Sequence, residues 1–419
     1  MTTTPATPGP GPAHTPTPAH TPHPDSAHTP DPAHTPAVPA LGHVPAQAAA
    51  HTSGSVPAGT PAGGVVGHPL DAAWQGGPDG SAGSDGPAGE GGVPSPDGVL
   101  RLINGYWATG VLAAAATHRL FTHLAAGAGE AAGLARAAGI SERGAQAMLD
   151  ALVALGLVEL RGSVYVNGPQ AATYLVEDSA VSLAGFARLK LKHMGALADL
   201  PQVVQAGGPV SDAVVEVADN PHWRELVLAI APQSVPAARV AAGVLGLAGA
   251  GPVEILDVGG GSGVYAATWL QANAAARVTQ LDWAPINAIA RSLMDQRGLA
   301  QRFTTIDGDF HTTDFGTGVY DVALYSHIAH QEGPGSNIEV FTRLRQALRD
   351  GGALVVCDYV VDDDRSGPAF PLVFACEMLL KSHHGSTWRQ AEYRDWLAKA
   401  GFTDITFHRA PPATLIVAR

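Results

Sequence analysis

The sequence predicts an α/β fold with a doubly wound, mostly parallel sheet, and three observations carry the prediction. A short apolar run at 253–256 ends at Asp257 and leads through a glycine-rich turn into a helical pattern, as a buried parallel strand would. Two late strand patterns, 404–408 and 414–418, predict a C-terminal antiparallel hairpin at the sheet edge. Further short apolar runs, each followed by polar residues, occur at 277–281, 303–306 and 319–325.

The turn after Asp257 carries glycine at alternate positions, Gly259, Gly261 and Gly263. In an open α/β sheet, a strand, glycine turn and helix form a nucleotide crevice, because glycine lets the backbone approach a ligand. The dinucleotide fingerprint needs a small residue where Val264 stands, and the Gly-Lys-Ser/Thr of a P-loop is absent from the turn. The acidic residue favours a cationic or hydroxyl-rich ligand; a glycine turn for another ligand is the alternative.

Two further carboxylates follow the next strand patterns. Asp282 lies 25 residues after Asp257, at the tip of the neighbouring strand, where a carboxylate can accept both ribose hydroxyls. The alternative role for such an aspartate is a helix N-cap. Asp309 stands beside Phe310 after the third strand, and this pair suits an adenine, which offers an amine to bind and a flat face to cover.

The fourth strand leads into a segment with two histidines, His327 and His330. A histidine just past a strand end is a candidate general base, since imidazole titrates near neutral pH. A structural role is expected for His327. The pair can alternatively hold a metal ion, completed by Asp358 or by His383 and His384. We predict no metal, because no third ligand follows at a fixed spacing.

With these segments in register, the chain resembles the two-domain, S-adenosyl-L-methionine (SAM)-dependent small-molecule methyltransferases of class I, a bacterial relative of plant caffeate and hydroxyindole O-methyltransferases. The resemblance covers roughly residues 98–419. It implies a Rossmann-like sheet, SAM as cofactor, His330 as the catalytic base and Asp358 as the acid that orients it. It implies cofactor binding by Asp257, Gly259, Gly261, Gly263, Asp282, Trp283, Asp309, Phe310 and Ser326. Substrate contacts are expected from His193, Met194, His327, Phe374 and Met378.

Three departures from the family pattern stand out. Phe310 takes a variable position and His311 the usual phenylalanine position. Gln331 and Glu332 replace the usual Asp-Trp after the catalytic histidine, and Thr387 replaces a second acidic partner. A less polarised histidine keeps two alternatives open: C-methylation of a 2-oxo acid or aromatic ring, and a SAM-binding homologue that uses the cofactor without transferring a methyl group.

Composition divides the chain near residue 97. Residues 1–96 contain no lysine or arginine and repeat Pro, Ala, His and Thr, so they cannot bury enough apolar surface to fold. They lack the basic and apolar regions of a signal peptide. A dispensable extension or a misassigned start is favoured over a docking arm or a His-rich metal buffer. The expected divisions are a disordered tail (1–97), a winged-helix dimerisation domain (98–200), a helical linker and pocket wall (201–245) and a SAM-binding domain (246–419).

The region 98–200 reads as helices followed by a hairpin, which is a winged-helix plan. A long apolar helix is expected over 99–117, and Ser141 is a candidate N-cap of the helix from residue 142. That helix has no basic face, so DNA binding is not expected, although a ligand-binding winged-helix regulator is a competing class. In the resembled family this region forms a homodimer.

Pro232 and Pro236 are expected to break the helical stretch 221–244 into two. The two cysteines, Cys357 and Cys376, make no disulfide framework, lie in apolar segments and predict buried thiols in a cytoplasmic protein. The net charge of −13 argues against nucleic-acid binding, and the lack of an uninterrupted run of about 18 apolar residues argues against a membrane span. The resemblance to the two-domain methyltransferases implies a dimeric enzyme that O-methylates an aromatic or polyketide-like small molecule.

Overall fold

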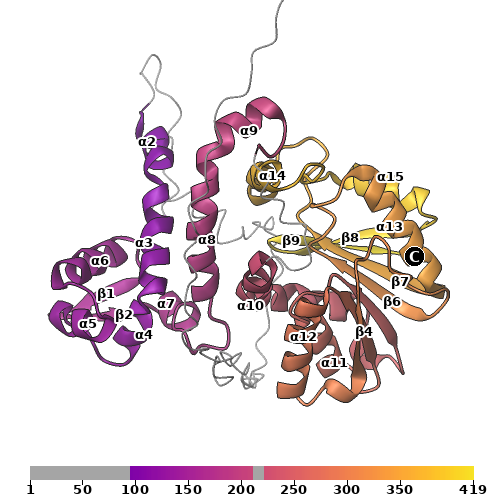
Figure 1. Cartoon of the computed structure of the whole chain (residues 1–419), viewed down its shortest axis with the longest axis horizontal. Coiled ribbons are helices and arrows are strands. Elements are labelled where there is room, and N and C mark those ends of the chain that lie inside the picture. The colour runs from indigo at the N-terminus through magenta and orange to yellow at the C-terminus, as the bar shows by residue number, and fades with distance from the viewer. Residues whose placement is uncertain (1–94, 211–220) are drawn as a thin grey trace, which may run out of the picture. The chain divides into compact units, whose positions relative to one another are not determined.

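The structure is a computed structural model that describes residues 95–210 and 221–419. The tail expected over 1–97 therefore lies almost wholly outside the described residues. The first described region is helical apart from one hairpin (Figure 1). Its elements are α2 (Asp97–Asn104), α3 (Tyr106–Thr117), α4 (Leu120–Ala125), α5 (Ala131–Ala138), α6 (Glu142–Ala154), β1 (Val158–Arg161), β2 (Val164–Asn167), α7 (Pro169–Tyr174), α8 (Ala184–Ala196), η1 (Leu197–Asp199), α9 (Leu200–Ala206) and α10 (Pro221–Val244).

The helix pair α5–α6 and the antiparallel hairpin β1–β2 follow the winged-helix plan that the sequence predicts. Leu120, Leu149, Leu152 and Val158 share one buried core, so the hairpin and the helices fold against each other. Ser141 caps α6 as expected, because its Oγ accepts a hydrogen bond from the Gly144 amide at 3.1 Å. Local sequence patterns therefore predict both the helices and the hairpin of this region.

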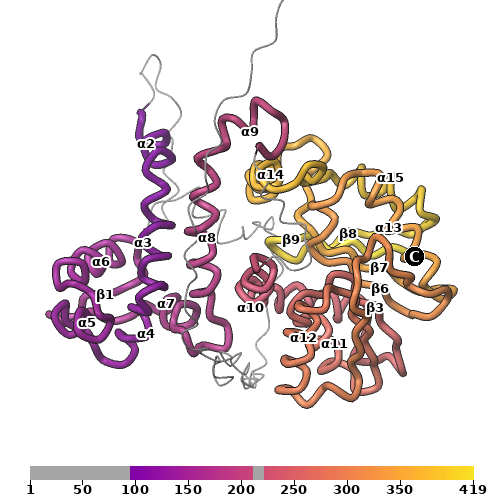
Figure 2. Tube along the Cα trace, viewed as in Figure 1, coloured from indigo at the N-terminus to yellow at the C-terminus, as the bar shows by residue number. Residues whose placement is uncertain are grey.

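The prediction that Pro232 and Pro236 divide the stretch 221–244 is wrong, because α10 runs unbroken through both prolines. Tertiary packing outweighs the lost amide hydrogen bonds. The helix contacts α8 and two helices of the following domain, α11 (Val264–Ala272) and α12 (Ala284–Gln296). The Cα trace in Figure 2 shows α10 beside α11 and α12.

A seven-stranded sheet forms the second region, in the order β5-β4-β3-β6-β7-β9-β8. The first five strands in this order pair in parallel, and the hairpin β8–β9 joins antiparallel to β7, as the sequence predicts. The strands are β3 (Glu254–Val258), β4 (Arg277–Asp282), β5 (Phe303–Asp307), β6 (Tyr320–Ser326), β7 (Leu348–Asp358), β8 (Ile405–Ala410) and β9 (Ala413–Ala418).

Helices cover both faces of this sheet. In Figure 1, α11 and α12 lie on one face, and α13 (Pro334–Ala347) and α15 (Gln390–Lys399) lie on the other. Phe341 on α13 and Trp396 on α15 belong to the large hydrophobic core between these two helices and the sheet, together with Tyr325 on β6. The remaining elements are α14 (Ala369–Lys381) and the short 3₁₀ turns η2 (Leu247–Gly249) and η3 (Ala300–Arg302).

The parallel strands place their carboxyl ends along one edge of the sheet. Val258 at the end of β3 pairs with Leu281 on β4 and with Tyr325 on β6, and Ser326 pairs with Cys357 on β7. The residues that follow these strands are therefore neighbours in space. In a doubly wound sheet this edge is where ligands bind.

Two helical stretches, 97–117 and 221–244, are long and apolar enough to cross a membrane by length and composition alone. Burial of Ala237, Ala238 and Ala241 against neighbouring helices accounts for the apolar character of α10. No residue of α2 is buried, so its apolar side chains are left uncovered in the single chain. Of the two cysteines, Cys357 is buried as predicted, but Cys376 on α14 is exposed.

Candidate active site

The glycine turn after β3 has the backbone that the sequence predicts. Gly259, Gly261 and Gly263 all have positive φ angles, +67°, +59° and +78°, which favour glycine. A side chain at Gly260 would meet Gln280 at 2.6 Å, so this position also needs glycine, although the alternating pattern did not single it out. Gln280 is buried and donates to the Gly261 carbonyl at 3.1 Å, which holds the turn against β4.

Asp257 is a buried carboxylate beside this turn. Within the described parts of the chain, neither of its oxygens has a hydrogen-bond partner. Burial, and secondarily the charge of Asp282, raises the pKa of Asp257 to about 8. A buried carboxyl without partners is costly unless a ligand supplies them. The site is therefore suited to a group that carries a positive charge and hydrogen-bond donors.

Asp282 ends β4 and turns toward the glycine loop. Its Oδ2 accepts from the Gly261 amide at 2.9 Å and its Oδ1 accepts from the Trp283 amide at 2.7 Å. Burial raises the pKa of Asp282 to about 6, although these two hydrogen bonds oppose the rise. The indole of Trp283 lies 5.8 Å from that of Trp223 on α10. Each carboxylate oxygen keeps a further acceptor position for a ligand hydroxyl.

The Asp309–Phe310 pair is linked to the histidine segment. Asp309 Oδ1 accepts from the His311 amide at 2.9 Å and lies 2.8 Å from His311 Nδ1, while His311 Nε2 lies 3.1 Å from a carboxylate oxygen of Glu332. Burial alone would lower the pKa of His311, but these two carboxylates raise it. Phe310 stacks on His311 and contacts Tyr325 edge-on. His311, which replaces the family's phenylalanine, thus ties the two loops together.

His330 and Asp358 form a buried pair at the carboxyl edge. His330 is 5% exposed, and its Nδ1 lies 2.6 Å from Asp358 Oδ1. The other carboxylate oxygen accepts from the His330 backbone amide at 2.9 Å. Burial favours the neutral carboxylic acid, but the charge and hydrogen bond of His330 hold the pKa of Asp358 below its usual range. The sequence-predicted pair is therefore brought into direct contact.

One segment holds the backbone of the histidine loop. Three successive carbonyls, of Ala329, His330 and Gln331, accept hydrogen bonds from residues of the segment 382–388. The donors are the Trp388 indole (3.0 Å), the Ser386 amide (2.9 Å) and the Ser382 hydroxyl (2.8 Å), respectively. Thr387, which replaces the family's second acid, is buried within this segment. Asp358 is therefore the acidic partner of His330 that the structure provides.

Aromatic side chains surround the imidazole of His330. The Phe374 ring of α14 meets it edge-on at 5.2 Å, and the Tyr359 ring stacks on it at 5.6 Å. Tyr359 follows Asp358 directly in the sequence, yet the motif did not single it out. Met378 is buried one turn after Phe374. His193 lies on α8, where it contacts Glu377 and Lys381 rather than His330, and Met194 is its neighbour.

His327 has a structural setting rather than that of a base. Its backbone is left-handed, with φ +58°, and its Nε2 lies 3.8 Å from Cys357 Sγ. Burial lowers its pKa to about 4, the charge of His330 adds to this, and Asp358 opposes it. The imidazole is thus neutral at pH 7.

The ligand atoms of His327, His330 and Asp358 lie within 4.8 Å of one another, which is close enough for a metal ion. The carboxylate of Asp358, however, already accepts hydrogen bonds from the amides of His330 and Tyr359 and from the Tyr393 hydroxyl, besides its contact with His330 Nδ1. A metal would have to displace these donors. The absence of a metal therefore stays a prediction.

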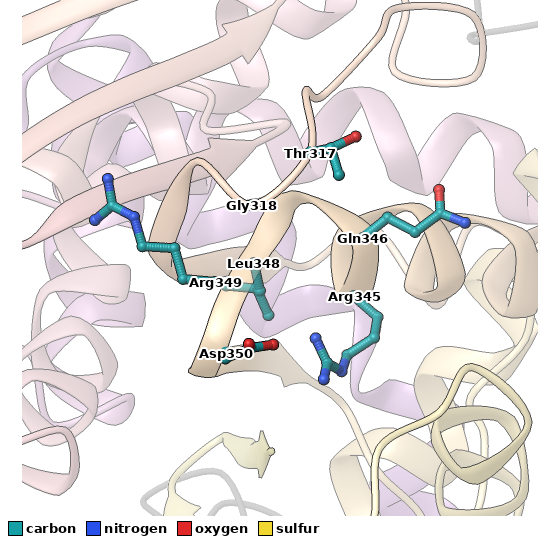
Figure 3. Close-up of a pocket in the computed structure, with 7 residues that line it drawn as sticks. All are labelled: Thr317, Gly318, Arg345, Gln346, Leu348, Arg349 and Asp350. Carbon is teal, nitrogen blue, oxygen red and sulfur yellow. The ribbon is translucent and has the colours of Figure 1, made fainter.

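A shallow recess of about 490 Å³ lies at the other end of the strands (Figure 3). It is formed where β6 and β7 begin, so it is separate from the carboxyl edge that holds His330 and Asp358. The lining residues are Thr317, Gly318, Arg345, Gln346, Leu348, Arg349 and Asp350.

Comparison with known families and proteins agrees with this geometry. The family model of the O-methyltransferase domain matches residues 246–403, and the family model of the O-methyltransferase dimerisation domain matches residues 100–177. The chain is 30% identical to 3-hydroxy-5-methyl-1-naphthoate 3-O-methyltransferase of Streptomyces sahachiroi, over 76% of this chain and 93% of the relative. It is 31% identical to the tetracenomycin polyketide synthesis 8-O-methyl transferase TcmO of Streptomyces glaucescens, over 78% and 97%.

A solved structure of human N-acetylserotonin methyltransferase in complex with SAM superposes with a TM-score of 0.69 at 21% identity, and the match covers 79% of this chain and 99% of the other. At this identity the likeness establishes the fold. Together with the matched domains and the two Streptomyces relatives, it confirms the expected class. The chain belongs to the two-domain O-methyltransferase family of class I SAM-dependent methyltransferases.

Proposed function

We propose that this enzyme transfers the methyl group of SAM to a hydroxyl of an aromatic or polyketide-derived small molecule in secondary metabolism. The observation that carries the proposal is the buried His330–Asp358 pair, with a 2.6 Å contact, at the carboxyl edge of the sheet. The names of the two Streptomyces relatives, a naphthoate and a tetracenomycin methyltransferase, support the substrate class. The family match favours O-methylation over the C-methylating and non-methylating alternatives.

The residues around the glycine turn fit the cofactor. The unpartnered, buried carboxyl of Asp257 suits the ammonium group of the methionine part, and Asp282 suits the ribose hydroxyls. Glycine at these positive-φ positions lets the turn approach a ligand closely without strain. We assign the adenine to Asp309 and Phe310, and further contacts to Trp283 and Ser326.

His330 acts in this proposal as the general base. Because Nδ1 faces Asp358, Nε2 is the nitrogen that takes the proton from the substrate hydroxyl. Asp358 fixes the tautomer and stabilises the imidazolium that forms. When bound, SAM supplies a methyl group already activated by its sulfonium, so the protein mainly positions the acceptor. Phe374, Tyr359 and Met378 would cover the aromatic acceptor, with His193, Met194 and His327 further along the wall.

The first test is calorimetric titration with SAM and with S-adenosylhomocysteine (SAH). We expect both ligands to bind the wild type, and Asp282→Ala to weaken both at least about tenfold, since a charged acceptor of two hydroxyls is lost. Asp295→Ala, an exposed aspartate on α12, is the matched control and should bind like the wild type. Failure of the wild type to bind either ligand would refute the proposal.

We further propose a homodimer formed through the uncovered helix α2 and the exposed first turn of α3. Leu102, Ile103 and Trp107 are exposed large side chains of these helices, and the dimerisation-domain match begins at residue 100. A contiguous apolar surface of this kind marks an interface. A second copy that covers it also accounts for the apolar stretch 97–117 without a membrane, in keeping with a cytoplasmic enzyme that binds no nucleic acid.

Introducing a charge into this surface is expected to separate the protomers. Ile103→Glu would bury a carboxylate in the interface, so sedimentation velocity should report a monomer where the wild type sediments as a dimer. Leu160→Glu, also an exposed leucine of the same domain but on the hairpin, should leave the dimer intact. A wild type that sediments as a monomer at micromolar concentration would contradict the assignment.

A further inference from the structure

Four charged or titratable side chains meet between α8 and α14. The carboxylate oxygens of Glu377 lie 3.0 Å from Lys190 Nζ, 2.7 Å from Lys381 Nζ and 3.1 Å from His193 Nδ1. Lys381 Nζ also lies 3.2 Å from both ring nitrogens of His193. We call these residues, Lys190, His193, Glu377 and Lys381, the Glu377 cluster. It joins parts of the chain that lie nearly two hundred residues apart.

The cluster has more positive charge than negative. It contains two ammonium groups and one carboxylate, and the side chains of Lys190 and Lys381 are only 31% and 20% exposed. Burial alone would raise the pKa of Glu377, but the hydrogen bond from His193 and the two lysine charges hold it well below its usual range. Among the described residues, the two ammonium groups share the single carboxylate of Glu377, and Lys190 Nζ also lies 5.2 Å from the centre of the Phe186 ring. Each ammonium has three donors, so part of this donor capacity remains for a ligand.

A neighbouring histidine is kept neutral mainly by burial and, secondarily, by the charges of the cluster. His222 on α10 lies 5.5 Å from the ring of His193. Burial, the charge of Lys381 and that of His193 together lower the pKa of His222 to about 4, and Glu225 and Glu377 do not offset them. His222 is therefore neutral at pH 7. In the part of the chain that the structure describes, an anion beside Lys381 would meet an ammonium group and the neutral imidazole of His222, with Glu377 already paired to both lysines.

The cluster lies along the same helix as the aromatic wall of His330. Glu377 and Lys381 follow Phe374 by three and seven residues, which places all three on one face of α14. At 1.5 Å per residue, they lie about 4.5 Å and about 10 Å beyond Phe374 along the helix axis. Glu377 is also close enough to Tyr359 to add to the rise in its pKa, after burial, Asp358 and Cys357.

We propose that the Glu377 cluster binds an anionic group of the acceptor, and that the preferred acceptor is a hydroxylated aromatic carboxylic acid. Its carboxylate lies at Lys381 and Lys190, and its hydroxyl lies at His330. The rise of about 10 Å along α14 from Phe374, which contacts His330, to Lys381 matches the length of a one- or two-ring aromatic skeleton. This inference rests on the proposed function, because it names the substrate class for the same site. The competing interpretation is that the cluster only ties α8 to α14.

The test measures binding to the SAH-saturated protein, so that slow turnover does not hide a ligand. Calorimetry compares 6-hydroxy-2-naphthoate and 3-hydroxy-1-naphthoate with their methyl esters, which keep the ring and the hydroxyl but lose the charge. We expect at least one acid to bind the wild type at least about tenfold more tightly than its ester. Lys381→Met should reduce the difference to less than about threefold and leave the affinity of the ester unchanged, and Lys190→Met should act in the same direction.

Lys192→Met is the matched control. Lys192 also lies on α8, but it is 67% exposed and pairs with Glu225 at 2.5 Å, so its loss should leave the preference for the acid intact. SAH binding by each variant reports that it is folded. Equal binding of acids and esters by the SAH-bound wild type would overturn the inference alone, as would a preference that both cluster variants retain. Absence of SAH binding would instead remove the proposed function.

Discussion

His330→Gln is expected to lower kcat by roughly 10²–10⁴-fold, the usual contribution of a positioned general base. Glutamine can keep a hydrogen bond to Asp358 but cannot take the proton of the acceptor hydroxyl. The affinity for SAM should stay near that of the wild type, because the proposed cofactor residues are not altered. Rates at saturating SAM and calorimetric binding of SAM separate these two effects.

His327→Asn is the matched control for this variant. Asparagine tolerates the left-handed backbone at residue 327, so the substitution removes an imidazole with little strain. The pKa of His327, lowered by burial to about 4, already makes it a neutral group at pH 7. We expect less than a tenfold loss in kcat. A loss as large as that of His330→Gln, or a His330→Gln variant with near-normal kcat, would contradict the assignment of the base.

Binding of SAM at pH 7 is expected to release close to one proton from Asp257. With a pKa of about 8, raised by burial, this carboxyl is mostly neutral in the free protein. The ammonium of the ligand favours the ionised carboxylate, so the pKa falls on binding and the proton leaves. Calorimetry in two buffers of different ionisation enthalpy gives the number of protons released. Asp257→Asn should abolish the release and weaken binding, since the amide carries no charge.

The same carboxyl predicts the pH dependence of stability. Its folded pKa of about 8 exceeds the ordinary value of about 3.9, so the unfolded chain binds fewer protons between these values. The neutral form favours folding below about pH 4, and this contribution is lost as the pH rises toward 8. Asp257→Asn should therefore raise the melting temperature of the free protein at pH 8 by several degrees. An unchanged or lower melting temperature would mean that the carboxyl is not desolvated in the free protein.

Much of the carboxyl edge could be predicted because parallel strands impose it. Once 253–256, 277–281 and 319–325 are read as strands, Asp257, Asp282 and the segment after Tyr325 must be neighbours. The contact between His330 and Asp358 needed the family resemblance as well, since the strand that ends at Asp358 was not predicted as a strand. The fold and the cofactor edge therefore followed from local pattern and topology.

The substrate side could not be predicted in the same way, because it joins distant helices. Nothing in the pattern around Lys190 signals a partner at Glu377, and their contact depends on how α8 and α14 meet. The continuity of α10 was also beyond local prediction, because its packing against three other helices outweighs the hydrogen bonds lost at Pro232 and Pro236. The contact between His311 and Glu332 could not be predicted either, because it joins two different loops. Both residues stand at positions where the sequence departs from the family pattern.

The segment 382–388 links the shape of the substrate to the chemistry. It begins where α14 ends, at Lys381, and it donates hydrogen bonds to the three consecutive carbonyls of Ala329, His330 and Gln331. A poorly fitting acceptor that pushes α14 outward would pull on this segment and shift the base away from its working position. Discrimination among acceptors would then show up as slower turnover of the bound complex rather than as weaker capture, so that a misfitting compound acts as an inhibitor.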